Sequence, residues 1–366
     1  MKKIVALINL IKILFSKKLK LVFYSESSFY QCYYIEVLKK ISSKVNDQII
    51  YLTSDFKEHV KLPNVKTLYI GNGYAMYFIF LILRARLVIM TTTDLNNNVI
   101  KISRSVDNYA YMFHAINSAH RAFTKNAFDN YNYIFCVGSY HNQELRSIEK
   151  ENSSRIKNLL ESGYPYFEYL QNKIDNSQKA NAILVAPSWN YDSENFFEKD
   201  SLNLIKKLLK MGRKVILRPH PEHFKRNSIL IDAFINLEKN FSNFYLDVSK
   251  DNISSMNAAK FLITDFSGIA PEFLFTYFRP VIYFDKYPKI HNKNFKNLNL
   301  IPFEDKVKNN FGIILNSIEE IGDKIFDIEN NYLIKEEGIK KFAKDNIYNF
   351  KFSADIYCEQ IIKIIN

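Results

Sequence analysis

The sequence is poor in cysteine, glycine and proline, and it lacks a long uninterrupted apolar run. Its 3 cysteines are scattered and odd in number, so we expect no disulfide framework and a reducing, cytoplasmic compartment. The longest apolar candidate, residues 74–90, contains two arginines, and a transmembrane helix of about 18 or more residues is therefore not predicted. Only 9 glycines and 9 prolines occur in 366 residues, while 47% of the residues are hydrophobic, which excludes a disordered chain.

The motifs of several large protein classes are missing as well. The sequence has neither a Walker loop nor Gly-x-Gly-x-x-Gly, which argues against nucleoside triphosphatases and nicotinamide-dependent enzymes. No Asp-x-Asp follows an expected strand and no zinc spacing is found, so we expect chemistry that needs no metal and no other cofactor. A basic block with interleaved aromatic residues is also absent, and nucleic acid is not expected as a partner.

Positive charge, in contrast, is abundant. The 50 lysines and arginines outnumber the 38 aspartates and glutamates, which gives a formal net charge of +12. This balance favours anionic partners, either a phosphorylated substrate or an anionic lipid surface. The sequence gives no indication of an oligomeric state.

Residues 1–18 have the pattern of an amphipathic helix. The apolar side chains fall on one helical face: Ile4, Leu7, Ile8, Ile11, Leu14 and Phe15. Lys12 lies on the other face and breaks the apolar core that a signal peptide requires, so a cleaved leader is not predicted. Two interpretations remain open. The helix either lies in an anionic membrane surface, which makes the protein peripheral on the inner face of the cell membrane, or packs on its own domain.

The length indicates two domains of roughly 150–180 residues each, because one ordinary core cannot hold 366 residues. Short apolar runs alternate with helix-like segments in both halves, which predicts an α/β fold with parallel, doubly wound sheets. A polar stretch at 172–180 is typical of a linker. We expect two Rossmann-like domains facing across a cleft, of the GT-B type. Their limits are 19–173 and 174–345, with an N-terminal helix at 1–18 and a C-terminal helix at 346–366 able to pack back on the first domain.

Candidate site residues are those that directly follow an expected strand, because ligands of open α/β sheets bind outside the carboxyl ends of the strands. In the first half this rule selects Ser25-Glu26, Thr92-Thr93-Asp94 and His114. In the second half it selects Pro187-Ser188-Trp189, Arg218-Pro219-His220 and Asp265-Phe266-Ser267-Gly268.

Two histidines are candidates for the chemistry. His114 follows a strand, where an imidazole can take a proton from an attacking hydroxyl near neutral pH, although a structural histidine is the alternative. His220 stands between two prolines beside Arg218, and this rigid pair suits a phosphoryl oxygen; an ordinary proline-rich turn is the alternative. The other five histidines are expected at the surface: His59, His120, His141, His223 and His291.

The segment from Thr264 to Glu272 predicts a diphosphate site. A short strand ends in Thr264 and Asp265, and Ser267 and Gly268 form the turn into a helix. Helix N-termini after small-residue turns offer free N–H groups and positive dipole ends, which suit phosphate. We expect Asp265 to orient the turn or cap the helix rather than bind metal. Glu272 either reaches ribose hydroxyls or is an ordinary first-turn glutamate.

Six short motifs then suggest a family. They occur in order as Phe23-Tyr24-Ser25-Glu26, Tyr111-Met112-Phe113-His114, Ser162-Gly163-Tyr164-Pro165, Ala186-Pro187-Ser188-Trp189, Arg218-Pro219-His220-Pro221 and Thr264-Asp265-Phe266-Ser267-Gly268. With them the chain resembles the CDP-glycerol glycerophosphotransferases of teichoic-acid and capsule synthesis. One departure is that Ala115-Ile116-Asn117 replaces the Gly-Thr-Pro that follows the first histidine of the family.

The resemblance implies a GT-B transferase at the membrane surface. An acceptor hydroxyl would attack the β-phosphorus of CDP-glycerol, or of a similar CDP-activated polyol, and release CMP. The two functional histidines of the family correspond to His114 and His220, and its phosphate-binding turn to Ser267 and Gly268, while Arg218 and Ser188 stand in matching motifs. The acceptor would be lipid-linked or a polysaccharide. Two alternatives stay open: a nucleotide-sugar glycosyltransferase or epimerase, and a non-catalytic nucleotide-binding subunit of envelope assembly.

Overall fold

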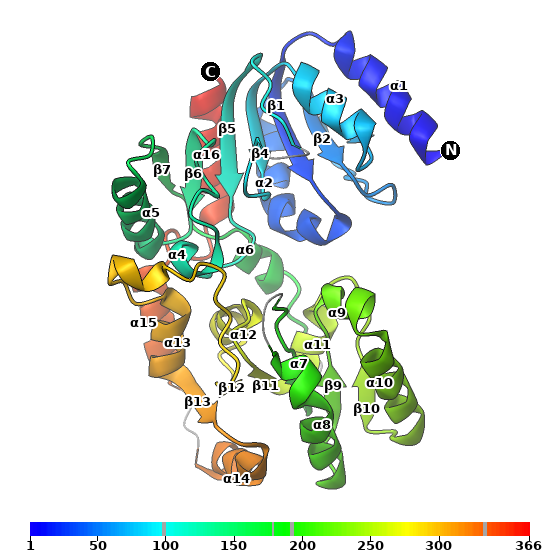
Figure 1. The fold of residues 1–366 in the computed structure, drawn as a ribbon, viewed down its shortest axis with the longest axis vertical. Coiled ribbons are helices and arrows are strands. Elements are labelled where there is room, and N and C mark those ends of the chain that lie inside the picture. Colours follow the sequence, from blue (N-terminus) through cyan, green and yellow to red (C-terminus); the bar gives the residue numbers. More distant parts are fainter. Residues whose placement is uncertain (97–99, 178, 191–193, 332–334) are drawn as a thin grey trace. The chain divides into compact units, whose positions relative to one another are not determined.

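The computed structural model describes residues 1–96, 100–177, 179–190, 194–331 and 335–366 (Figure 1). The chain forms two compact units. Unit 1 comprises Met1–Tyr169, Asn292–Leu300 and Lys344–Asn366, and unit 2 comprises Leu170–His291 and Ile301–Ala343.

Unit 1 is built on a parallel sheet, which within the described residues has seven strands in the order β3-β2-β1-β4-β5-β6-β7. The strands are β1 (Leu19–Ser25), β2 (Ile49–Thr53), β3 (Val65–Tyr69), β4 (Ala85–Met90), β5 (Val106–Met112), β6 (Tyr133–Cys136) and β7 (Asn158–Glu161). The central strands are almost entirely buried apolar runs, as expected of parallel strands covered on both faces.

The helices of unit 1 cover this sheet. They are α1 (Lys2–Leu14), η1 (Ser28–Tyr30), α2 (Gln31–Lys44), α3 (Tyr74–Ile82), α4 (Ala119–Ala122), α5 (Ser139–Asn152), α6 (Tyr166–Gln171), η2 (Phe295–Leu298) and α16 (Ser353–Ile365), where α6 crosses into unit 2. Helix α15 (Glu336–Asn346) lies mainly in unit 2, and unit 1 resumes at Lys344 near its end. Helix α16 packs beside α2, and Val37 and Leu38 join Tyr357 and Ile361 in one buried cluster. The C-terminal segment is therefore part of the core of unit 1.

Unit 2 holds a second parallel sheet, with six strands in the described residues in the order β10-β9-β8-β11-β12-β13. The strands are β8 (Ala182–Val185), β9 (Val215–Leu217), β10 (Phe244–Leu246), β11 (Ala259–Thr264), β12 (Val281–Phe284) and β13 (Gly312–Leu315). The helices are α7 (Phe196–Lys199), α8 (Ser201–Lys210), α9 (Pro221–Arg226), α10 (Ser228–Asn240), α11 (Ile253–Ala258), α12 (Ile269–Tyr277), α13 (Phe303–Phe311), η3 (Ile318–Glu320) and α14 (Ile321–Asn330). The order runs from β3 back to β1 and then forward from β4 in unit 1, and from β10 back to β8 and then forward from β11 in unit 2. The strand order therefore reverses at β1 and at β8, as in doubly wound folds.

Helix α1 packs on unit 1 through the face opposite to its apolar one. Ala6, Asn9 and Ile13 are buried, and the amide of Asn9 donates to the carbonyl of Tyr69 at 2.9 Å. The apolar face that the sequence pattern predicts points away from the unit, and Phe15 just beyond the helix is 80% exposed. Helix α3 lies beside α1 (Figure 1) and also leaves apolar side chains exposed. Packing on the domain thus occurs, but it does not cover the apolar face.

None of the helices among the described residues is both long enough and apolar enough to cross a bilayer.

Candidate functional site

The candidate donor site lies at the carboxyl ends of β8 and β11, which are neighbours in unit 2. The carboxylate of Asp265 accepts the backbone N–H of Ser188 at 2.7 Å and its hydroxyl at 2.8 Å. Burial raises the pKa of Asp265, while the two bonds from Ser188 and the cation of Lys289 oppose the rise. Asp265 therefore fixes the segment after β8 against the turn after β11.

The turn that follows Asp265 leads directly into α12. Gly268 is the N-cap residue of this helix, and Ser267 beside it is half-buried. The hydroxyl of Thr264 donates to the carbonyl of Ala186 at 2.5 Å, so Thr264 joins the two strands. Glu272 lies buried in the first turn of the helix. The first N–H groups of a helix have no partner inside it, and the dipole makes this end positive, which suits an anionic ligand.

Arg218 points along the sheet to the loop after β10. Its guanidinium donates to Asp247 at 2.7 Å and to the hydroxyl of Ser249 at 3.2 Å. A third bond reaches the carbonyl of Lys250 at 3.4 Å. The side chain is thus engaged within unit 2, and a nucleotide would have to share its donors with the Asp247 loop.

His220 forms the N-cap of the short helix α9. Its Nδ1 accepts the backbone N–H of Glu222 at 3.2 Å, so the neutral ring carries its proton on Nε2. The pKa of His220 is lowered, mainly because neighbouring protein atoms displace water from the imidazole and secondly because of the positive charge of Lys289. Part of the side chain is nevertheless exposed. The imidazole is therefore neutral near pH 7 and presents an N–H donor.

Lys289 is a residue that the sequence analysis missed. It follows β12 by five residues and is half-buried, and burial lowers the pKa of its ammonium group while Asp265 raises it. Its charge lowers the pKa of both Asp265 and His220. The same strand-end rule that selected the other candidates could have found it, because Lys289 lies on the segment that leaves the next strand of the sheet.

Three histidines expected at the surface are buried instead: His120, His141 and His223. His223 lies 3.1 Å from the carbonyl of Ser188 through Nε2 and stacks on Phe197, so it helps to hold the segment after β8 in place. His120 lies 3.1 Å from Glu144. The expectation was wrong because sequence spacing along a helix does not show which of its sides another segment will cover. His59 and His291 are exposed, as expected.

In unit 1, His114 lies two residues after the end of β5, among tyrosines. The ring of Tyr30 meets the imidazole edge-on at a centroid distance of 5.1 Å, and the ring of Tyr33 does so at 6.0 Å. Tyr33 in turn contacts Tyr166 at 4.7 Å. His114, Tyr30 and Tyr33 are half-buried.

The segment after His114 is held by α5. The hydroxyl of Tyr140 donates to the carbonyl of Ile116 at 3.0 Å, and Nε2 of His141 lies 2.9 Å from the carbonyl of Asn117. Burial lowers the pKa of His141 to about 3, so this ring is neutral; it stacks on Phe113 at 3.8 Å. The segment that replaces the family's Gly-Thr-Pro is therefore fixed by specific bonds.

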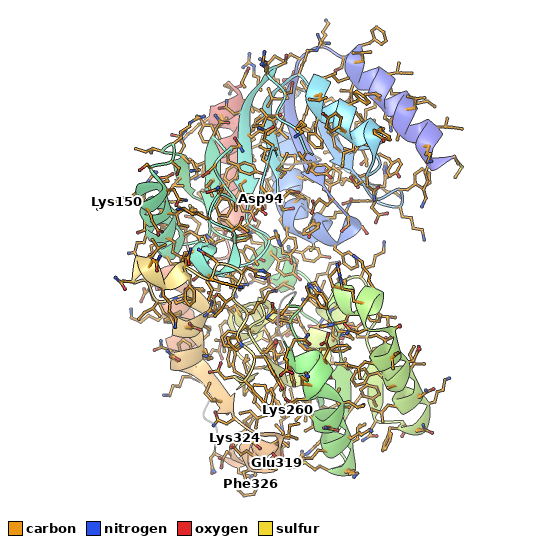
Figure 2. The ribbon with its side chains drawn as sticks, in the orientation of Figure 1. Asp94, Lys150, Lys260, Glu319, Lys324 and Phe326 are labelled. Carbon is orange, nitrogen blue, oxygen red and sulfur yellow. The ribbon has the colours of Figure 1, made fainter. Side chains whose placement is uncertain are left out.

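The remaining strand-end candidates of unit 1 have local partners. Asp94, labelled in Figure 2, accepts hydroxyl bonds of 2.9 Å from Thr93 and from Thr124. Ser25 donates to the carbonyl of Ser27 at 2.7 Å and to Glu58. These hydrogen bonds hold the loops at the ends of β1 and β4 in place. In the part of the chain that the structure describes, no group of three or more His, Cys, Asp or Glu residues is arranged to hold a metal ion.

The structure thus divides the predicted residues between two units. Ser188, Asp265, Thr264, Ser267 and Gly268 lie at one end of the unit 2 sheet. The neighbouring strand end carries Arg218 and His220, and the first turn of α12 carries Glu272. His114 belongs to unit 1.

Comparison with solved structures identifies the class of fold. The wall teichoic acid polymerase TagF matches with a TM-score of 0.63 and 16% identity over 94% of this chain and 89% of that one. A TagF variant soaked with CDPG matches with a TM-score of 0.62 and 14% identity over 100% of this chain and 96% of that one. The UDP-GlcNAc 2-epimerase of Methanocaldococcus jannaschii matches with a TM-score of 0.60 and 14% identity over 94% of this chain and 99% of that one. The fold is of the GT-B type, which confirms the prediction from the sequence.

The family follows from the sequence itself. Residues 42–347 match the model of the CDP-glycerol:poly(glycerophosphate) glycerophosphotransferases. The chain belongs to this family, and it is a transferase. The resemblance that rests on six short motifs is therefore confirmed. No curated protein matches the chain in sequence.

Proposed function

We propose that this protein transfers glycerophosphate from CDP-glycerol to a hydroxyl group of an acceptor and releases CMP. The observation that carries the proposal is the match of residues 42–347 to the glycerophosphotransferase family. The polymer that we propose is a teichoic acid or a related capsule polymer of the cell envelope, and TagF, a wall teichoic acid polymerase, has the same fold.

The donor site that we propose is the N-terminus of α12. The turn at Ser267 and Gly268, at the positive end of the α12 dipole, would receive the diphosphate of CDP-glycerol. The neutral imidazole of His220 would donate its Nε2–H to a phosphoryl oxygen, and the ammonium group of Lys289 would balance the charge that develops there. Asp265 has a positioning role, because it holds Ser188 beside the turn.

The reaction that we propose is a direct displacement at the β-phosphorus. The acceptor oxygen forms a bond to this phosphorus, and the bond between the phosphorus and the bridging oxygen breaks. The electron pair leaves with CMP, and His114 takes the proton of the acceptor hydroxyl. No other co-reactant is needed for the atoms and charges to balance.

We also propose that the exposed apolar face of α1 and α3 lies on an anionic membrane. Lys2, Lys3 and Lys12 are exposed on α1. Apolar side chains between lysines suit a lipid surface, where they enter the acyl boundary while the lysines contact headgroups. A lipid-linked acceptor would meet the enzyme at this surface.

The test of the function is donor binding combined with CMP release. A thermal-shift panel should show stabilisation by CDP-glycerol or CDP-ribitol that exceeds the stabilisation by UDP-sugars or CMP-sugars. His114→Ala should keep this donor affinity and lose about 10²–10⁴ in kcat for CMP release. Release of UDP from a nucleotide sugar would favour the glycosyltransferase alternative. Donor binding with both histidines dispensable would favour the non-catalytic alternative.

A further inference from the structure

We propose that His141 is a positioning residue of the transfer reaction, and that it holds the backbone on both sides of His114. This role rests on the proposed function, in which His114 takes the proton of the acceptor hydroxyl. His141 stands in the first turn of α5 and is completely buried. The contacts that support its role all lie within unit 1.

The side chain of His141 joins the ends of two neighbouring strands. The ladder between β5 and β6 ends with the pair Met112 and Phe135. Beyond this pair, Nδ1 of His141 accepts the backbone N–H of Val137 at 3.2 Å, and Nε2 lies 2.9 Å from the carbonyl of Asn117. Val137 follows β6, and Asn117 stands on the segment that follows β5. The imidazole therefore continues the connection between the two strands where their backbone ladder ends.

These two contacts fix the tautomer of the ring. A ring nitrogen that accepts an N–H carries no proton itself, so the proton of the neutral imidazole is on Nε2, where it donates to the carbonyl of Asn117. Burial lowers the pKa of His141 to about 3, so the ring is neutral near pH 7. One acceptor and one donor are thus both used, and a side chain without this pair of groups cannot replace them.

His141 also contacts the residue just before His114. Its ring stacks on Phe113 with a centroid distance of 3.8 Å and an angle of 22° between the ring planes. The bond to Asn117 holds the chain shortly after His114. The backbone is therefore held on both sides of the candidate base, which limits how far its imidazole can move. A general base needs this, because it acts only within hydrogen-bond reach of the proton that it takes.

The start of the helix that carries His141 is itself anchored. The carbonyl of Val137 accepts the backbone N–H of Tyr348 at 2.9 Å. A Cβ at Gly138, the N-cap residue of α5, would clash with the carbonyl oxygen of Asn346, so this glycine lets the C-terminal segment approach closely. The position of His141 is therefore set by unit 1 before any substrate binds.

Nitrogen NMR of the histidine rings tests the geometry without substrate. We expect His141 of the wild-type protein to be the neutral Nε2–H tautomer throughout the range from about pH 5 to 8, in which an ordinary histidine changes its charge. The signals are assigned by their loss in His141→Phe. A charged ring or the Nδ1–H tautomer in this range would overturn the proposal, whether or not the variants fold.

Two substitutions separate the hydrogen bond from the stacking. His141→Phe keeps an aromatic ring against Phe113 and removes both bonds, whereas the amide in His141→Gln can still donate to Asn117. We expect His141→Phe to lower kcat for CMP release by about 10–100-fold, the cost of a misplaced group, with KM for CDP-glycerol unchanged. His141→Gln should regain most of kcat. His59→Phe, at an exposed histidine of unit 1, is the matched control and should keep the wild-type kcat.

The outcomes are distinct for the positioning role and for the proposed function. Circular dichroism in urea selects conditions in which each variant is folded. A folded His141→Phe protein with the kcat of the wild type would overturn the positioning role. Equal losses in His141→Phe and His141→Gln would do so as well, because the hydrogen bond would then not be what matters. A wild-type protein that releases no CMP from CDP-glycerol would instead contradict the proposed function, while the tautomer of His141 still decides the geometry.

Discussion

At the scale of single residues, the candidate donor site depends on one buried carboxylate. Asp265 is only 2% exposed, and both of its oxygens accept bonds from Ser188. In unit 1, Glu168 has a comparable role at the start of α16, where it accepts the backbone N–H of Ala354 at 3.0 Å. In both cases an acidic side chain fixes a backbone segment that carries or supports the candidate site.

Asp265→Ala should destabilise the protein by about 2–4 kcal/mol, because it leaves the N–H and the hydroxyl of buried Ser188 without their acceptor. Asp265→Asn should lower the free energy of unfolding by less, because the amide oxygen of asparagine can still accept a hydrogen bond from Ser188. Urea unfolding measures both. Asp232→Ala, at an exposed position of α10, should stay within about 0.5 kcal/mol of the wild type. An Asp265→Ala protein as stable as this control would show that the bonds to Ser188 do not matter.

Glu168 should make stability fall as pH rises. Burial raises its pKa from the ordinary 4.5 to about 7, so the folded state holds this proton more tightly than the unfolded state. Its contribution is full below pH 4.5 and is lost progressively between 4.5 and about 7. Glu168→Gln should remove this part of the slope, as seen in the difference between the two urea-unfolding curves across pH. A constant difference from pH 4.5 to 7 would contradict the raised pKa.

At the scale of secondary-structure elements, α1 and α3 differ from the other helices of unit 1. Helix α2 buries its apolar face in the core, whereas α1 turns Ile4, Leu7 and Ile11 away from the unit. Helix α3 adds Tyr74 and Phe78 to this exposed face. Two adjacent helices with uncovered apolar side chains and exposed lysines are typical of a surface that meets lipid.

The double variant Ile8→Ser, Ile11→Ser should lower binding to vesicles of phosphatidylglycerol and phosphatidylcholine by at least about 10-fold, because each isoleucine adds apolar area to the lipid contact. Cosedimentation measures the binding. Phe326→Ser removes an exposed apolar side chain from α14 of unit 2 (Figure 2) and should have no effect. Salt should weaken wild-type binding, since lysines near the surface contribute about 1 kcal/mol each. Equal binding of all three proteins would restrict α1 to a packing role.

At the scale of the whole molecule, the chain does not divide into two continuous halves. Unit 1 takes residues 344–366 from the C-terminal end and a short segment, Asn292–Leu300, from within the second half. The segment is bound to unit 1 by the amide of Asn292, which donates to the carbonyl of His120 at 2.9 Å. Its last residue, Leu300, offers a carbonyl 3.3 Å from the ring of the same histidine.

Residues 1–169 expressed alone should therefore lack a cooperative unfolding transition. Without α16, the buried side chains of Val37, Leu38 and Ile41 lose their cover, at about 1.5–3 kcal/mol each, and typical domains have only about 5–15 kcal/mol in total. The matched protein joins 344–366 to 1–169 through a flexible linker and should regain the transition. Circular dichroism in urea compares the two. A cooperative transition at the same midpoint in both would show that α16 is dispensable.

The sequence by itself determined the alternation of strands and helices, the GT-B class and the family. It also selected the strand-end residues from Ser188 to Gly268 that lie together in unit 2. These features could be predicted because a parallel strand is a local apolar run and because the residues after it meet at one edge of the sheet. The direction in which α1 turns its apolar face could not be predicted, since periodicity shows that a face exists but not what covers it.

Only the tertiary structure decided which distant segments meet. It placed α16 beside α2 and residues 292–300 on unit 1, and it lets the charge of Lys289 lower the pKa of Asp265 and of His220. It also buried His120, His141 and His223, and it gathered Tyr30, Tyr33 and Tyr166 near His114. Such contacts join residues tens to hundreds of positions apart. They depend on how whole elements pack, so the local pattern of one sequence does not contain them.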